Sequence, residues 1–155
     1  MTTWTRHLYE HNDLAIAKGE SNGYSTLFKY GFNPDIDGTE ETIWTHGGNI
    51  PWPDTAFTAY AVSSNSNDSG GGTGSNTIQV EGLDADYNIK SVSVTLNGTT
   101  PVEVSGTWIR INRSFVTLAG TGGTSAGTIL IQNSDASVVY ADLGAGNQTQ
   151  IAAYT

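Results

Sequence analysis

The sequence predicts an all-β protein, built as an antiparallel sandwich or jelly-roll-like barrel with a long, poorly regular, aromatic-rich N-terminal arm. Charged residues make up only 14% of the 155 residues, against about 25% in typical domains, and 19 residues are glycine. Short segments of alternating apolar and polar residues recur about every ten residues after residue 76, separated by glycine-rich turns. Both observations favour short strands joined by turns over helices.

The N-terminal part, residues 1–60, is expected to form the arm or attachment segment. It holds ten of the 15 aromatic residues, yet its apolar pattern shows little sustained periodicity. A weak pattern gives a candidate helix over His7–Lys18, and alternation gives a candidate strand over Thr26–Phe32. The prolines of Ile50-Pro51-Trp52-Pro53 remove two amide donors, so we expect this stretch at a sheet edge or in an extended connection.

Residues 61–76 are rich in Ser, Asn and Gly, and we expect a mobile loop or linker there because they offer almost nothing to bury. Residues 77–155 are expected to form the β domain. Its first strands, Thr77–Glu81 and Ile89–Leu96, predict a hairpin around Leu83–Asn88. Asn97-Gly98 predicts a tight turn before the alternation resumes at Val102 and Val104. Further strands are predicted at Trp108–Asn112, Phe115–Ala119, Thr128–Gln132, Val138–Asp142 and Thr149–Tyr154.

The charge balance argues against several classes of partner. Fifteen carboxylates against six Lys and Arg give a formal charge of -9, so the long-range field repels nucleic-acid phosphates and anionic lipid headgroups. The first twenty residues contain no apolar run suited to a secretory signal or a membrane span, so we expect synthesis in a cytoplasm. With no cysteine, neither a disulfide framework nor a thiolate metal site is available.

No motif indicates catalysis or metal binding. Gly19-Glu20-Ser21-Asn22-Gly23 matches the G-x-S-x-G pattern of a nucleophile elbow, but no strand and helix are predicted around it, so we interpret it as a turn. His7 and His11 have the spacing of metal ligands on a helix without further ligands nearby. Asp84, Asp86 and Asn88 begin like a calcium loop, but Ile89 stands where such loops have glycine. We expect no enzyme activity, no metal and no cofactor.

Several segments resemble one family of proteins. They are Tyr30-Gly31-Phe32-Asn33-Pro34-Asp35-Ile36-Asp37, Glu41-Thr42-Ile43-Trp44, Val80-Glu81-Gly82-Leu83-Asp84-Ala85-Asp86-Tyr87-Asn88, Val94-Thr95-Leu96-Asn97-Gly98-Thr99-Thr100 and Ile109-Arg110-Ile111-Asn112-Arg113-Ser114-Phe115. In these segments the chain is similar to virion structural proteins of tailed phages of marine bacteria, cyanophages included, over most of residues 25–155. Members of that family are usually longer and carry another β-rich stretch after the point where this chain stops, which implies truncation or disorder at the C-terminus. Separately, the last predicted strand runs to the final residue with no polar tail, so we expect that the chain is the ordered part of a longer polypeptide or that this strand pairs with another protomer.

The resemblance implies a structural place in the virion, after assembly in the host cytoplasm, without fixing which part of the particle. Our interpretation is a capsid-associated decoration or head-fibre protein. By analogy we expect a homo-oligomer, a trimer, whose N-terminal part docks on the major capsid protein or another virion protein. Aromatic and arginine side chains are favoured where proteins meet, and the arginines are expected to meet carboxylates of a neighbour or of their own chain. The interface residues predicted on this basis are Trp4, Tyr9, Tyr24, Phe32, Trp44, Trp52, Arg110 and Arg113.

Three alternatives stay open. The aromatic side chains could instead cap the ends of the chain's own β-core. The protein could be a tail-fibre or baseplate-associated module that binds a receptor or host surface glycan, with Trp44, Trp52 and Trp108 as a sugar-stacking platform. The third alternative is a small β-sheet hydrolase, and the Ser21 motif is the only feature that supports it.

Overall fold

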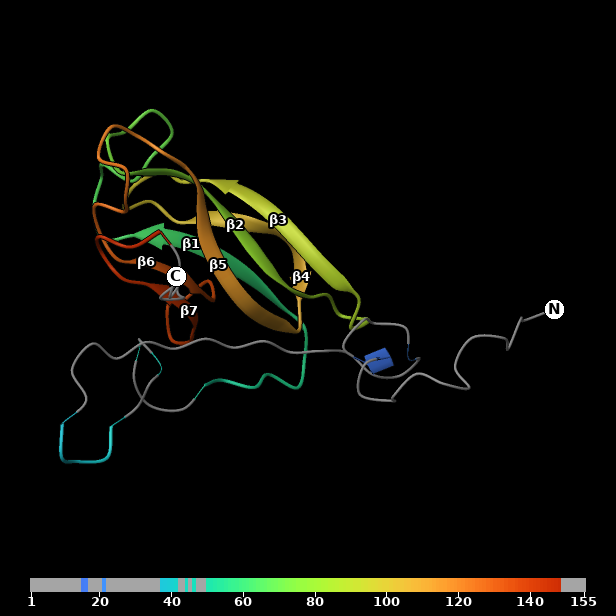
Figure 1. Ribbon diagram of the computed structural model, residues 1–155. Helices are drawn as coiled ribbons and strands as arrows, with labels where there is room; N and C mark the ends of the chain where they lie inside the picture. Colours follow the sequence, from blue (N-terminus) through green and yellow to red (C-terminus); the bar gives the residue numbers. More distant parts are fainter. Residues whose placement is uncertain are drawn as a thin grey trace.

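The computed structural model describes residues 15–16, 21, 37–41, 44, 46 and 50–148, and the strands of this part form two antiparallel sheets (Figure 1). The predicted all-β class and the packing of antiparallel sheets are confirmed. The jelly-roll-like barrel and the arm stay predictions. In chain order the strands are β1 Phe57–Ser63, β2 Ser75–Leu83, β3 Ile89–Thr95, β4 Val102–Trp108, β5 Arg110–Ala119, β6 Ile129–Gln132 and β7 Val139–Leu143.

The chain passes between the sheets several times. One sheet has the order β4-β1-β6-β7 and the other has the order β3-β2-β5. The predicted hairpin is confirmed, because β2 and β3 pair from Thr77↔Thr95 to Leu83↔Ile89. The turn at Asn97-Gly98 is also present, with Gly98 at φ 60°, but it leads from β3 in one sheet to β4 in the other. This turn therefore crosses the sandwich and closes no hairpin.

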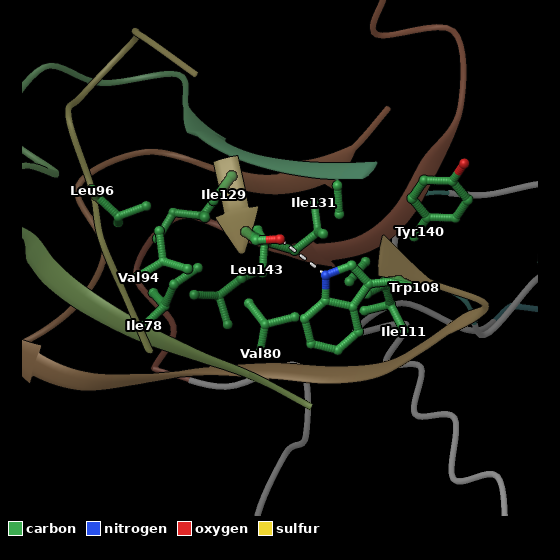
Figure 2. Packing of buried hydrophobic residues seen from close by; sticks show 14 residues of the cluster. Ile78, Val80, Val94, Leu96, Trp108, Ile111, Ile129, Ile131, Tyr140 and Leu143 are labelled. Atoms are coloured by element: carbon green, nitrogen blue, oxygen red, sulfur yellow. Dashed lines mark hydrogen bonds between the residues drawn. The ribbon is translucent and has the colours of Figure 1, made fainter. Parts of the chain in front are cut away.

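The core lies between the two sheets, and alternation along the strands fills it. In β2, Ile78 and Val80 are fully buried while Gln79 and Glu81 are partly exposed on the other face. Figure 2 shows Ile78 and Val80 in one cluster with Ile129 and Ile131 of the opposite sheet. Burying each such side chain contributes roughly 1.5–3 kcal/mol relative to leaving it in water.

Trp108 is the largest fully buried side chain of the described residues. Its indole Nε1 donates a hydrogen bond to the Val104 carbonyl at 3.0 Å, the dashed line in Figure 2, so the polar atom of the ring is satisfied inside the core.

Strand β4 ends at Trp108, and β5 runs without interruption from Arg110 to Ala119. The two strands predicted over Trp108–Asn112 and Phe115–Ala119 are thus wrong in their boundaries.

The expected linker begins inside a strand and ends inside another. Strand β1 extends to Ser63 and lies between β4 and β6, and β2 begins at Ser75, two residues before the predicted start of the β domain. The loop between them does bury a side chain, that of Asp68, which is 0% exposed. The prediction that this segment has almost nothing to bury is therefore wrong. The division of the chain into arm, linker and β domain stays a prediction.

Asp68 joins the loop 64–74 to the loop 120–128. Its Oδ1 accepts hydrogen bonds from the amides of Ser75 (2.7 Å) and Ala126 (2.8 Å). Its Oδ2 accepts from the Ser63 hydroxyl (2.6 Å) and the Gly127 amide (2.8 Å). A Cβ at Gly74 would lie 2.2 Å from Asp68 Oδ1, so only glycine lets the backbone pass this close to the carboxylate.

Candidate interaction surface

One end of the sandwich carries an exposed tryptophan held beside an arginine. Trp52 is 54% exposed, and the guanidinium carbon of Arg110 lies 5.3 Å from the centre of its ring. Arg110 Nη1 donates to the carbonyls of Pro53 (2.5 Å) and Ile109 (2.6 Å), which fixes the guanidinium group. A cation near a ring face stabilises the pair by about 0.5–1 kcal/mol at an exposed site. The predicted extended connection around Pro51 and Pro53 thus presents Trp52 to solvent.

A small hollow lies beside this tryptophan. It is lined by Ile50, Pro51, Trp52, Pro53, Arg110, Ile111 and Tyr140. The Tyr140 ring stacks on Phe57, with 3.9 Å between centroids and an interplanar angle of 18°. Burial raises the pKa of Tyr140, and the nearby Asp135 carboxylate adds to the effect. The hollow is therefore a mainly apolar depression with one guanidinium group at its rim.

Two further exposed apolar side chains belong to the same end. Ile89 is 82% exposed and Tyr87 is 52% exposed, and both lie where β2 turns into β3. Strand pairing places Ile89 close to Arg110, because Leu83 pairs with Ile89 on one side and with Arg110 on the other. Arg110 in turn lies beside Trp52. Figure 1 shows the β2–β3 turn and the β4–β5 corner at one end of the sandwich. We call Trp52, Tyr87, Ile89 and Arg110 the Trp52 end.

Sequence reasoning missed Tyr87 and Ile89. A usable signal existed for Ile89, because Val92 and Val94 predict the buried face of this strand, and an odd-numbered isoleucine then falls on the opposite face. Tyr87 carried no comparable signal. Its φ of 62° belongs to the left-handed region, which residue patterns predict mainly for glycine and asparagine.

Lys90 and Asp84 lie at the same end, where β2 turns into β3. Lys90 Nζ donates to the Thr107 carbonyl at 3.1 Å and lies 4.2 Å from the Trp108 ring centre. Burial lowers the pKa of Lys90, and the charge of Asp84 acts in the opposite direction.

Asp84 Oδ1 accepts hydrogen bonds from the amides of Asp86 and Asn88, both at 2.9 Å. The bond from the Asn88 amide is the largest cause that lowers the pKa of Asp84. The Asp84–Asn88 segment is therefore a closed hairpin turn.

His46 contacts strand β7 of the four-stranded sheet, and Trp44 lies beside His46. Trp44 is only 6% exposed, and its ring centre lies 5.6 Å from that of His46. His46 Nδ1 lies 3.3 Å from Asp142 Oδ2, and Asp142 is 7% exposed at strand β7. Burial raises the pKa of Asp142, while the contact with His46 partly offsets this effect. Trp44 is thus covered within its own chain.

Arg113 meets a carboxylate of its own chain. Its Nε donates to Glu81 Oε2 at 2.6 Å across the β2–β5 pair, and its guanidinium carbon lies 4.7 Å from the Phe115 ring centre.

Three of the predicted interface residues reach the surface in the described part of the chain: Trp52, Arg110 and Arg113. Trp4, Tyr9, Tyr24 and Phe32 lie outside the described residues, as do the candidate strands Thr26–Phe32 and Thr149–Tyr154 and most of the candidate helix His7–Lys18.

The proposed sugar-stacking platform of three tryptophans is wrong. Trp108 is fully buried and Trp44 nearly so, which leaves Trp52 alone at the surface. Among the described residues no group of three or more His, Asp or Glu side chains is arranged to hold a metal ion. A search of the same residues found no helix with the length and apolar character needed to cross a bilayer. Comparison with protein-family models, curated proteins and solved structures gave no match.

Proposed function

We propose that this chain is a structural component of a tailed-phage virion, a capsid-associated decoration or head-fibre protein. It self-associates and docks on the major capsid protein or another virion protein through its N-terminal part, residues 1–60. A jelly-roll-like form of the sandwich belongs to the same proposal. The observation that carries it is the Trp52 end, where a fixed arginine and exposed apolar side chains lie on a rigid sandwich. The resemblance of residues 25–155 to virion structural proteins is the reason for proposing that the protein is part of a virion.

The arrangement suits binding between proteins. Exposed tryptophan and arginine side chains supply much of the affinity at protein interfaces, since they cover a large area with few rotatable bonds. Trp52 belongs to the N-terminal part, so an attachment through that part brings it close to the docking surface. Because Arg110 is fixed by two carbonyls, little side-chain entropy is lost when a partner covers it.

The test is to locate the protein in the particle. Gold-labelled antibody against the full chain, applied to purified virions of the phage that encodes it, should decorate the head, on its shell or at a vertex. Label on the tail would instead favour the second candidate below. Virions that carry no label, while the antigen stays in the unassembled fraction, would contradict the proposal.

A matched pair of substitutions tests the docking role of Trp52. Trp52→Ala, introduced into the phage genome, should lower the number of copies per virion measured by quantitative mass spectrometry. Leu118→Ala is the control, because Leu118 is 58% exposed and lies at the opposite end of β5 from Arg110. Equal losses for both variants, or none for Trp52→Ala, would contradict the docking role.

A receptor- or carbohydrate-binding role, as in a tail-fibre or baseplate-associated protein, is the second candidate. The exposed Trp52 ring beside Arg110 favours it, since a sugar can stack on such a ring. A glycan array probed with the full chain should then show binding that Trp52→Ala abolishes, and an array without binding would rule this role out.

A further inference from the structure

We propose that the free edge of strand β3 binds a second copy of this chain, by antiparallel strand pairing about a two-fold axis at Val92. The inference deepens the proposed function, because it names the surface used for self-association. It rests on that proposal only for its biological setting, since the contact itself is argued from the described residues.

The other three edge strands are interrupted or covered. Strand β4 bulges against β1, where the register jumps from Thr58↔Thr107 to Ala59↔Val104, and Gly106 in the bulge has φ 75°. Strand β7 has five residues and a register shift against β6. Strand β5 has three register shifts against β2, and its Val116 amide donates to the Gln148 carbonyl at 2.6 Å. Bulges, short length and covering segments are the devices that keep sheet edges from pairing.

Strand β3 lacks these devices. Its seven residues pair with β2 in unbroken register, and among the described residues β2 is the only strand that pairs with its backbone. Its single charged residue, Lys90, is near one end of the strand, and its Nζ is held away from the edge by the Thr107 carbonyl and the Trp108 ring. An edge strand presents unpaired N–H and C=O groups at every second residue, which are ready to continue the ladder.

The strand is also complementary to itself. Antiparallel pairing about Val92 places Ser91 opposite Ser93 of the second copy, and Ile89 opposite Thr95 of the second copy. All four of these positions are exposed on the outer face of the sheet in the described structure. Paired hydroxyl side chains stabilise neighbouring strands, and the methyl group of Thr95 would cover part of the 82% exposed Ile89. A two-fold interface needs such a self-complementary patch.

Charge favours this edge as the place where two copies meet. The chain carries a formal charge of -9, so most contacts between copies bring carboxylates together. Strand β3 contains no carboxylate, and the neighbouring Glu81 on the same face accepts a hydrogen bond from Arg113 at 2.6 Å. Repulsion between two acidic chains is therefore small along this strand. The resulting assembly is a dimer, in place of the trimer that analogy predicts.

The experiment uses three versions of the full 155-residue chain: the wild type, Ser91→Lys with Ser93→Lys, and Ser91→Glu with Ser93→Glu. Their masses are measured by sedimentation equilibrium and multi-angle light scattering. In the proposed register, each doubly substituted chain sets like charges opposite each other at two places, whereas a mixture of the two chains sets opposite charges there. Ser105→Lys, at an exposed position of strand β4, is the matched control.

The wild type and the control should be dimers, and both double variants should be monomers whose dimer Kd is raised by about 100-fold or more. The mixture should restore the dimer, which also demonstrates that both variants fold. A monomeric wild type, a trimeric wild type, double variants that remain dimeric, or a mixture that stays monomeric would each overturn the inference. A negative result here leaves antibody labelling of the virion unaffected, so failure of the β3 contact and failure of the virion role are distinguishable.

Discussion

Replacing Asp68 tests whether one buried carboxylate holds the loops at one end of the sandwich together. The side chain is 0% exposed and accepts four hydrogen bonds, from the amides of Ser75, Ala126 and Gly127 and from the Ser63 hydroxyl. Asp68→Asn preserves the shape but replaces one acceptor oxygen by an NH₂ donor. The best orientation keeps the oxygen on Ser75 and Ala126, and the new NH₂ group then faces the Gly127 amide, which becomes an unpaired buried donor.

The expected loss follows from these bonds. An unsatisfied buried donor costs about 1–3 kcal/mol, and hydrogen bonds to a charged group contribute about 1.5–3 kcal/mol each, against about 1 for neutral pairs. We therefore expect Asp68→Asn to lower the free energy of unfolding by about 3 kcal/mol, and Asp68→Ala by about 4 kcal/mol or more. Ser63→Ala removes the hydroxyl that donates to Asp68 and accepts from the Asn65 amide, and should cost about 1.5–2 kcal/mol. Since a domain of this size is stable by only about 5–15 kcal/mol, these are large effects.

Urea unfolding followed by tryptophan fluorescence is a suitable assay, because Trp108 is fully buried and reports loss of the core. The control is Asp86→Asn at an exposed turn position, which should change the free energy of unfolding by less than about 0.5 kcal/mol. The Ser63→Ala and Asp68→Asn losses should be less than additive when combined, since both remove the same bond. If Asp68→Asn stays within about 1 kcal/mol of the wild type at unchanged m-value, the loop joint contributes little and the reasoning fails.

Three further substitutions test other contacts by the same unfolding assay. Gly82→Ala should cost about 1–3 kcal/mol, because its Cβ would lie 2.0 Å from the Arg110 carbonyl oxygen in the backbone; unchanged stability would contradict this packing. Glu81→Gln should cost less than about 1 kcal/mol, since the ion pair with Arg113 is about one-third exposed on both sides; a loss above about 2 kcal/mol would show a stronger contact. Burial raises the folded-state pKa of Asp142 above its ordinary value of 3.8, so the folded protein holds this proton more tightly and loses stability as pH rises through that window. The advantage of Asp142→Asn over the wild type should therefore grow as pH rises above 3.8, and a difference independent of pH would refute the burial effect.

The regular strands of the second half could be predicted because each has one polar face. In β2 and β3 the apolar residues alternate with Ser, Thr, Gln and Glu, so the period was readable from the sequence, although β2 extends two residues beyond its predicted bounds at each end. Strand β1 gave no such signal. It lies between β4 and β6, its inward residues are small (Ala59, Ala61 and Ser63), and its outward residues include Tyr60 and Val62. A central strand with apolar residues on both faces loses the alternation by which strands are recognised.

The loop joint could not be predicted for a different reason. Asp68 stands in a Ser-, Asn- and Gly-rich stretch whose composition is typical of linkers, and two of its four donors, the amides of Ala126 and Gly127, come from 58 and 59 residues further along the chain. Long-range polar contacts of this kind leave no local pattern. The candidate surface was predictable in part: Trp52, Arg110 and Arg113 were chosen by residue type, but burial of Trp44 and Trp108 depends on packing that residue type does not reveal.

The two ends of the sandwich differ in a way that bears on how such a protein could work. Strand β2 begins at Ser75, whose amide binds Asp68, and ends at Leu83, which pairs with both Ile89 and Arg110. At the first end polar loops are bonded to each other, and at the second end apolar and aromatic side chains face solvent. A binding surface needs a rigid support, because any ordering of the surface on contact reduces affinity. Weakening the Asp68 joint should therefore lower stability while leaving contacts at the Trp52 end unchanged in the molecules that remain folded.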